Sequence, residues 1–218
     1  MKRKKVLGLE RESKSSEISQ LLREIVPGTH AILIYDSPES KREVLFSHLA
    51  FGAADSRLVY VCSEESPDQI EREMERFGIR VKSLQSAGRL SILDYEEVYL
   101  KEGKVDIPQA IGLLSHLAWS CRKENLEGGL RVAEEMSFFF RHRTLGDAAL
   151  YEKRLHRTFF FPSMGICAYN LNEIQASGQL ETLLALLHSR DRVVLTGPKG
   201  FSILEPQVQQ GPEITVSH

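Results

Sequence analysis

Residues 30–62, HAILIYDSPESKREVLFSHLAFGAADSRLVYVC, contain the repeating unit that predicts the fold. An apolar run, Ala31–Tyr35, is followed by a polar turn, a helical pattern over Lys41–Ala53 and a second apolar run, Leu58–Cys62. Both runs are almost continuously apolar rather than alternating, as in strands that are buried on both faces of a parallel sheet. A strand, a helix and a second strand in this order predict a βαβ unit with a right-handed crossover.

The same unit recurs along the chain and predicts an α/β domain. Further strand candidates are Leu90–Leu93, Leu130–Ala133, Gly165–Tyr169, Arg192–Thr196 and the short run Phe201–Leu204. Helical patterns lie at Glu17–Ile25, Pro67–Phe77, Pro108–Glu124, Asp147–Phe160 and Gly178–Ser189. This alternation predicts a three-layer, doubly wound, mostly parallel sheet with helices on both faces. We expect a polar arm with a short helix over 1–27, the domain itself over 28–196, and a short strand with a polar tail over 197–218.

Composition narrows the class of protein. The 218 residues include 28 Lys and Arg against 30 Asp and Glu, so the nearly neutral chain has no overall attraction for nucleic acid or for an anionic membrane. No run of apolar residues is long enough for a signal peptide or a membrane span, which predicts a cytoplasmic protein. The three cysteines form no CxxC pair, and the histidines form no HxH or HExxH arrangement. We therefore expect neither a disulfide framework nor a metal site, and no cofactor.

The turn after the first predicted strand stands where a nucleotide hydrolase would hold its phosphate-binding loop. Such a loop needs glycines, so that backbone N–H groups can surround phosphate, followed by Lys and then Ser or Thr. Lys41 is present, but the turn has no glycine, and Arg42 stands where Ser or Thr should be. The turn consists of Asp36, Ser37, Pro38, Glu39 and Ser40, and its two acids would repel a triphosphate. We predict no ATP hydrolysis and no catalytic residue here, and expect Asp36 or Ser37 to cap a helix with Pro38 in its first turn.

The stretch from residue 30 to residue 79 resembles the opening of a KaiC/RecA-type ATPase core whose phosphate loop has been replaced. A wider resemblance, to the MEDS sensory family, extends from residue 30 to about residue 172. The segments that carry it are HAILIYDSPES (30–40), LVYVCSEESP (58–67), AGRLSILDYEEVYLKEGKVD (87–106), LRVAEEMSFFF (130–140), YEKRL (151–155) and GICAYNLNEI (165–174). The resemblance implies a RecA-like fold without a working phosphate loop, and a sensory role for small organic compounds in signalling or transcriptional regulation.

In a doubly wound sheet, ligands bind beyond the carboxyl ends of the strands. The segments that follow the predicted strands are rich in acids and aromatic residues. The candidate ligand-binding residues are His30, Tyr35, Asp36, Glu64, Glu65, Asp94, Tyr99, Glu135, Met136, Phe138, Cys167 and Tyr169, and the replaced phosphate loop contributes Ser37, Ser40, Lys41 and Arg42. His30 is included because the resemblance covers it. The excess of acids favours a neutral or cationic ligand.

Several of these candidates also have a structural interpretation. Ser66 is placed to cap the helix that begins at Pro67, which would leave the neighbouring Glu64 and Glu65 as part of a turn. Glu135 stands where a nucleotide hydrolase would hold a magnesium-binding carboxylate. Without a phosphate loop it is interpreted either as a polar anchor in a pocket walled by Met136 and Phe138, or as part of a solvated turn beside a Phe-rich core segment. Cys167 is expected to be a small buried core residue, because no histidine lies within its segment to activate it.

Three functions remain open from the sequence. The first is a sensor that binds a small organic ligand and signals by association with a protein partner or a second copy, without contacting DNA or membrane itself. The second is a degenerate ATPase that serves as an adaptor without a ligand. The third is an atypical nucleotide-binding enzyme that uses Lys41 and Arg42 with Glu65 and Glu135.

Overall fold

The computed structural model describes residues 22, 25, 27–158, 163–178, 192–197 and 200–204. Its strands are β1 (His30–Tyr35), β2 (Ser56–Cys62), β3 (Leu90–Asp94), β4 (Leu100–Lys101), β5 (Lys104–Val105), β6 (Gly129–Glu135), β7 (Ser163–Asn170), β8 (Arg192–Gly197) and β9 (Gly200–Leu204). Its helices are α2 (Pro38–Phe51), α3 (Pro67–Phe77), α4 (Val81–Ser86), α5 (Tyr95–Tyr99), α6 (Ile107–Lys123), α7 (Phe138–Arg141), α8 (Leu145–Thr158) and α9 (Leu171–Ser177).

A seven-stranded sheet forms the centre of the α/β fold, in the order β3-β2-β6-β7-β1-β8-β9. Every neighbouring pair is parallel except β8 and β9, which form an antiparallel hairpin at one edge. β4 and β5 make a separate two-stranded hairpin. The predicted mostly parallel sheet with helices on both faces is therefore confirmed.

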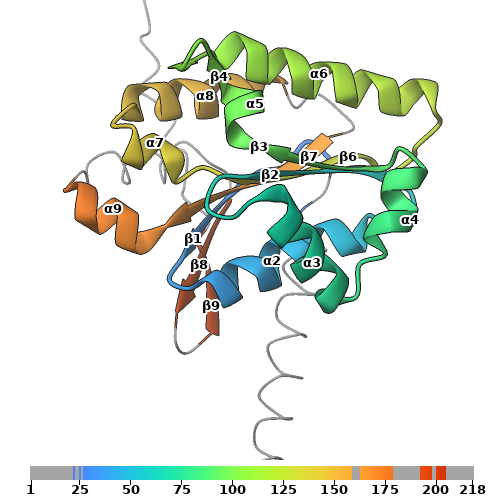
Figure 1. Cartoon of the computed structure of the whole chain (residues 1–218), viewed down its shortest axis with the longest axis horizontal. Helices are drawn as coiled ribbons and strands as arrows, with labels where there is room; N and C mark the ends of the chain where they lie inside the picture. The colour runs from blue at the N-terminus through green and yellow to red at the C-terminus, as the bar shows by residue number, and fades with distance from the viewer. Residues whose placement is uncertain are drawn as a thin grey trace, which may run out of the picture.

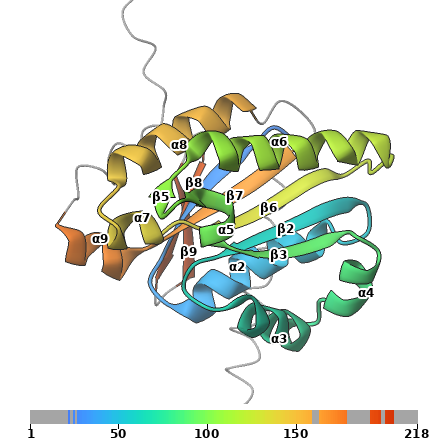
Figure 2. The same ribbon diagram turned by 45° about the horizontal axis from the view of Figure 1, so that its top comes forward.

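Helices cover both faces of the sheet, as Figures 1 and 2 show. One apolar core lies between the sheet and α5, α6, α7, α8 and α9, and we call this side of the sheet the α6 face. A second core lies between the sheet and α2, α3 and α4, and we call this side the α2 face. Successive strand residues point to opposite faces, so Ile32 and Val59 pack on the α6 face, while Leu33 and Tyr60 pack on the α2 face.

The starts of two helices follow the sequence prediction. Ser37 caps α2, accepting a hydrogen bond from the backbone N–H of Ser40, and Pro38 occupies the first turn. Ser66 caps α3 in a reciprocal capping box with Gln69, again with a proline in the first turn. Because proline has no N–H to leave unpaired and a φ already suited to a helix, it fits these positions. Both turns that were considered as ligand-binding segments therefore also start helices.

Several elements differ from the sequence prediction. α4, α5, α7, α9 and the β4–β5 hairpin were not predicted; all are short, with too few residues for a clear apolar period. The predicted helix Gly178–Ser189 lies outside the described residues after Gly178, which instead ends α9 with a positive φ. The predicted helix Glu17–Ile25, the proposed arm over 1–27 and the tail after residue 204 fall largely or wholly outside the described residues. No helix within the described ranges is long and apolar enough to cross a bilayer.

Candidate functional site

The carboxyl ends of β1, β2 and β6 meet the start of α2 and enclose a group of charged and aromatic side chains on the α2 face. We call this group the strand-end cluster. It consists of Tyr35, Lys41, Tyr60, Glu64, Glu65 and Glu135. Parallel strands end at the same edge of a sheet, so segments that are distant in the sequence meet here.

Lys41 is the centre of the strand-end cluster. Although α2 begins at the edge of the sheet, the Lys41 side chain is completely buried. Its Nζ atom lies 2.6 Å from Glu135 Oε1, 3.0 Å from Glu64 Oε2 and 3.6 Å from Glu65 Oε2. An unpaired buried ammonium would be very unfavourable, and these carboxylates compensate for its lost hydration.

Glu135 is as deeply buried as Lys41, and both of its oxygens are fully used. Oε1 accepts from Lys41 Nζ and, at 2.6 Å, from the Tyr60 hydroxyl. Oε2 accepts from the backbone N–H groups of Ser63 and Glu64, at 2.7 and 2.8 Å. The carboxylate therefore fixes the turn after β2 as well as the lysine.

The contacts within this cluster favour the charged forms of Lys41 and Glu64. Burial alone would lower the pKa of the Lys41 ammonium, but the Glu135 and Glu64 carboxylates outweigh burial and raise that pKa. Burial alone would raise the pKa of Glu64, but Lys41 and a hydrogen bond from the Tyr35 hydroxyl lower it below its ordinary value. Burial raises the pKa of the Tyr35 phenol, and Glu64 raises it further, so Tyr35 remains a neutral donor.

A partly exposed rim adjoins the strand-end cluster. The side chains of Glu64 and Glu65 are 14% and 19% exposed, so the carboxylates at the rim can meet solvent or a ligand. Arg42 pairs with Glu65 and, at 3.4 Å, with Glu73. Two cations, Lys41 and Arg42, are thus in contact with four carboxylates, which gives this region an excess of negative charge.

A second polar group lies on the α6 face, directly behind the first. Glu134 precedes Glu135 on β6 and therefore points to the opposite side of the sheet. Its carboxylate accepts from Tyr99 at 2.7 Å, from Tyr151 at 2.9 Å and from Cys167 Sγ at 3.3 Å. Burial raises the pKa of Glu134 to about 7, although the hydrogen bonds from these three side chains act to lower it.

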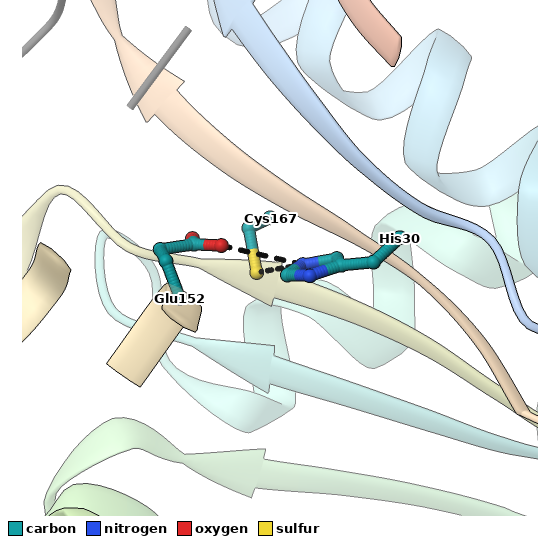
Figure 3. Close-up of side chains that lie close together, drawn as sticks. All are labelled: His30, Glu152 and Cys167. Carbon is teal, nitrogen blue, oxygen red and sulfur yellow. Dashed lines mark hydrogen bonds and ion pairs between the residues drawn. The ribbon is translucent and has the colours of Figure 1, made fainter. Parts of the chain in front are cut away.

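The second group continues to His30 of β1 and Glu152 of α8. His30 Nε2 lies 3.0 Å from Cys167 Sγ and 3.5 Å from Glu152 Oε2 (Figure 3). The other oxygen of Glu152 accepts from the Tyr169 hydroxyl at 2.5 Å. We call His30, Glu152 and Cys167 the buried triad, and all three are enclosed in the core.

Comparison with known proteins identifies the family. Residues 29–186 match the family described as MEDS, the methanogen/methylotroph, DcmR sensory domain, over most of the chain. The chain belongs to the MEDS family. An uncharacterized protein from Pyrococcus horikoshii, whose crystal structure contains an unknown peptide, has a similar fold. The two share 19% identity with a TM-score of 0.56, over 80% of this chain and 82% of that one. No curated protein matches the sequence.

The candidate ligand residues of this MEDS domain separate into two groups. Tyr35, Glu64, Glu65 and Glu135 meet in the strand-end cluster, and Lys41 joins them, while Arg42 lies at the rim. His30, Tyr99, Cys167 and Tyr169 lie on the opposite face, in the second polar group. The sequence prediction grouped all these residues because each lies at or near a strand end, but in the structure the sheet separates them into two groups on opposite faces.

The remaining candidates have mainly structural contacts in the MEDS domain. Asp36 accepts from the hydroxyls of Ser40 and Thr196, which holds the start of α2 against β8. Asp94 caps α5 by accepting from the N–H of Glu96. Met136 and Phe138 pack in the core of the α6 face rather than beside Glu135, and Phe138 stacks on Phe139 with ring centroids 4.1 Å apart.

Sequence reasoning missed several members of the two groups. Tyr60, Glu134, Tyr151 and Glu152 were not proposed as site residues, and the buried triad was not foreseen. The double acid at the end of β6 was the available signal, because adjacent strand residues point to opposite faces and two buried acids require two sets of partners. From the sequence, Glu135 was assigned to a ligand pocket, whereas Glu134 was given no role.

Proposed function

We propose that this MEDS domain is a non-catalytic, cytoplasmic sensor that binds a small organic ligand at the strand carboxyl ends. The observation that carries this proposal is the complete burial of Lys41 among three carboxylates. In a nucleotide hydrolase, a lysine at this position must be free to reach the phosphates of the substrate. Here its three nearest charged partners are Glu64, Glu65 and Glu135.

The rest of the turn supports the same conclusion. A phosphate-binding loop presents its N–H groups to the ligand, whereas here Ser37 accepts the N–H of Ser40 as the cap of α2. Asp36 places a carboxylate at the same turn and is bonded to Ser40 and Thr196. A triphosphate would meet negative charge and a helix cap that is already satisfied.

The charge of the rim favours a neutral or cationic ligand. A ligand that donates a hydrogen bond or carries a positive charge would compete with Lys41 for Glu64, which is partly exposed. Lys41 would then depend more strongly on Glu135, and Glu135 also holds the backbone of Ser63 and Glu64. Binding at the rim would in this way shift the population of the turn after β2.

We further propose that the signal leaves the domain by association, with a protein partner or with a second copy, in the control of transcription. The domain itself would not bind DNA or membrane. The Pyrococcus horikoshii protein of similar fold holds a peptide in its crystal structure, and we therefore include peptides among the partners to be tested.

A second candidate function is an adaptor that binds no small ligand. It is favoured by how completely Tyr35, Lys41 and Glu135 are buried, because a filled cluster leaves little space for an organic molecule. Exposed Trp119 of α6, with Lys123 Nζ 4.0 Å from its ring centroid, would then be part of a protein-binding surface.

A thermal-shift screen distinguishes the candidates. A ligand that binds only the folded state raises the melting temperature, and the stabilisation grows with the logarithm of its concentration once that concentration exceeds Kd. We expect stabilisation by a neutral or cationic organic compound of the panel, and none by Mg-ATP. The effect should be lost in Glu64→Gln and kept in the control Glu75→Gln, which changes an exposed acid on α3.

The other outcomes of this screen would favour one of the two alternative functions. No response to any compound, together with a melting temperature that rises with added peptide, would favour the adaptor. Stabilisation by Mg-ATP that requires Lys41 would contradict the sensor and favour the atypical enzyme.

A further inference from the structure

The buried triad brings three metal-binding side chains of different chemistry together. His30 Nε2 lies 3.0 Å from Cys167 Sγ and 3.5 Å from Glu152 Oε2, and the three ligand atoms lie within 4.8 Å of one another. In a tetrahedral zinc site with bonds of about 2.0–2.3 Å, neighbouring ligand atoms are about 3.3–3.6 Å apart. The two distances from His30 are close to this range, so small side-chain movements would place all three atoms around one ion.

We propose that His30, Glu152 and Cys167 bind a divalent transition-metal ion of the Zn²⁺ class. A thiolate and an imidazole select such ions over Mg²⁺ and Ca²⁺, which prefer oxygen ligands. The thiol proton of Cys167 leaves to solvent when the metal takes its place. Three protein ligands leave one position of a tetrahedron for water or another small ligand.

The secondary structure fixes the positions of these ligands. In the parallel register of β1 and β7, Cys167 lies opposite Ile32. His30 is two residues before Ile32 and therefore shares its face of the sheet, which is also the face of Cys167. Glu152 approaches from α8 (Figure 3), whose apolar residues pack in the core on this face of the sheet. Ligands on regular elements hold their geometry better than ligands on loops.

One outer contact orients a ligand as in known metal sites. The Tyr169 hydroxyl donates to Oε1 of Glu152, and Oε2, the oxygen nearer His30, would face the proposed ion. Outer hydrogen bonds of this kind commonly fix the ligands of a metal and raise its affinity.

This site is distinct from the proposed ligand site. It lies on the α6 face, whereas the strand-end cluster lies on the α2 face, so each proposal can fail without the other.

The test is metal binding by the untagged, full-length protein. After removal of metals with a chelator, reconstitution with Zn²⁺ or Co²⁺ should give one ion per chain by elemental analysis. Co²⁺ should also produce a thiolate-to-metal charge-transfer band. The band should disappear in Cys167→Ser and persist in Cys121→Ser, since Cys121 is a buried cysteine that bonds to the Leu117 carbonyl within α6.

Two further measurements do not depend on the folding of a ligand variant. X-ray absorption of the zinc-loaded wild-type protein should show one sulfur at about 2.3 Å and nitrogen or oxygen neighbours at about 2.0–2.1 Å. Tyr169→Phe keeps all three ligands but removes the hydrogen bond to Glu152, and should weaken zinc binding by about 10–100-fold. Tyr169 is thus a positioning residue for the metal.

The proposal is overturned if the folded wild-type protein takes up no stoichiometric ion. It is equally overturned if the bound zinc has no sulfur neighbour, or if the Co²⁺ band persists in folded Cys167→Ser. If the protein binds no metal but a small ligand still raises its melting temperature in a way that depends on Glu64, the metal proposal fails and the sensor proposal stands.

Discussion

Lys41 Nζ and Glu135 Oε1 lie 2.6 Å apart, and neither side chain is exposed to solvent. Each carries a charge that the other makes tolerable inside the fold, so the removal of one partner leaves an uncompensated buried charge. This pair connects the helix after β1 to the end of β6, which is two strands away in the sheet.

Lys41→Met should therefore destabilise the protein strongly. We expect the free energy of unfolding to fall by about 3–5 kcal/mol, because the Glu135 carboxylate would remain buried without its cation. Urea denaturation measures this change, with Lys82→Met at an exposed position of α4 as the control. The double variant Lys41→Met/Glu135→Met should lose less unfolding free energy than the sum of the losses in the two single variants. Additive losses would mean that the pair is not coupled.

His48 should make the protein acid-sensitive. Burial, followed by the nearby Arg131 guanidinium, lowers the pKa of His48 from 6.5 to about 3. Between these two pH values His48 is protonated in the unfolded chain but remains neutral in the folded protein. This contribution to stability is thus complete above pH 6.5 and is lost as the pH falls towards 3.

Chemical denaturation at a series of pH values measures the effect of His48. Between pH 6 and pH 4, His48→Leu should reduce the slope of unfolding free energy against pH by up to about 1.4 kcal/mol per pH unit. His116→Leu, which changes an exposed histidine of α6, is the matched control. An unaltered slope in His48→Leu would show that His48 is protonated equally in both states.

Two glycines should respond in opposite ways to alanine. Gly112 lies inside α6 with nothing within 4 Å of an added Cβ, so Gly112→Ala should stabilise the protein by up to about 1 kcal/mol. At Gly52 an added Cβ would lie 2.1 Å from Cδ of Arg131, whose side chain is packed in the core, so Gly52→Ala should destabilise. Thermal melts of both variants test this, and equal effects would contradict the packing described at Gly52.

The capping box of α3 should be measurable in the same way. Ser66→Ala removes the acceptor for the N–H of Gln69 and should cost about 1 kcal/mol. Ser83→Ala, at an exposed position of α4, is the matched control. If the two variants unfold at the same urea concentration, the Ser66 hydroxyl contributes nothing to the helix.

The fold followed from the sequence where the signals were local. Apolar runs predicted the strands, and a serine followed by proline predicted the starts of α2 and α3, because both depend on neighbours within a few residues. The composition of the strand-end cluster and of the second polar group could not be predicted in this way. His30 and Cys167 are 137 residues apart. They meet only because β1 pairs with β7, and no local pattern determines that strand order.

Glu134 and Glu135 are consecutive residues of β6 that serve opposite faces of the sheet. A shift of this strand end that alters one carboxylate must also displace the other. Two binding events, one on each face, would then share a coupling free energy. If a metal ion in the buried triad changed the affinity of the strand-end cluster for its ligand by some factor, that ligand would change the affinity for the metal by the same factor. Titration of each in the presence of the other would measure this reciprocity.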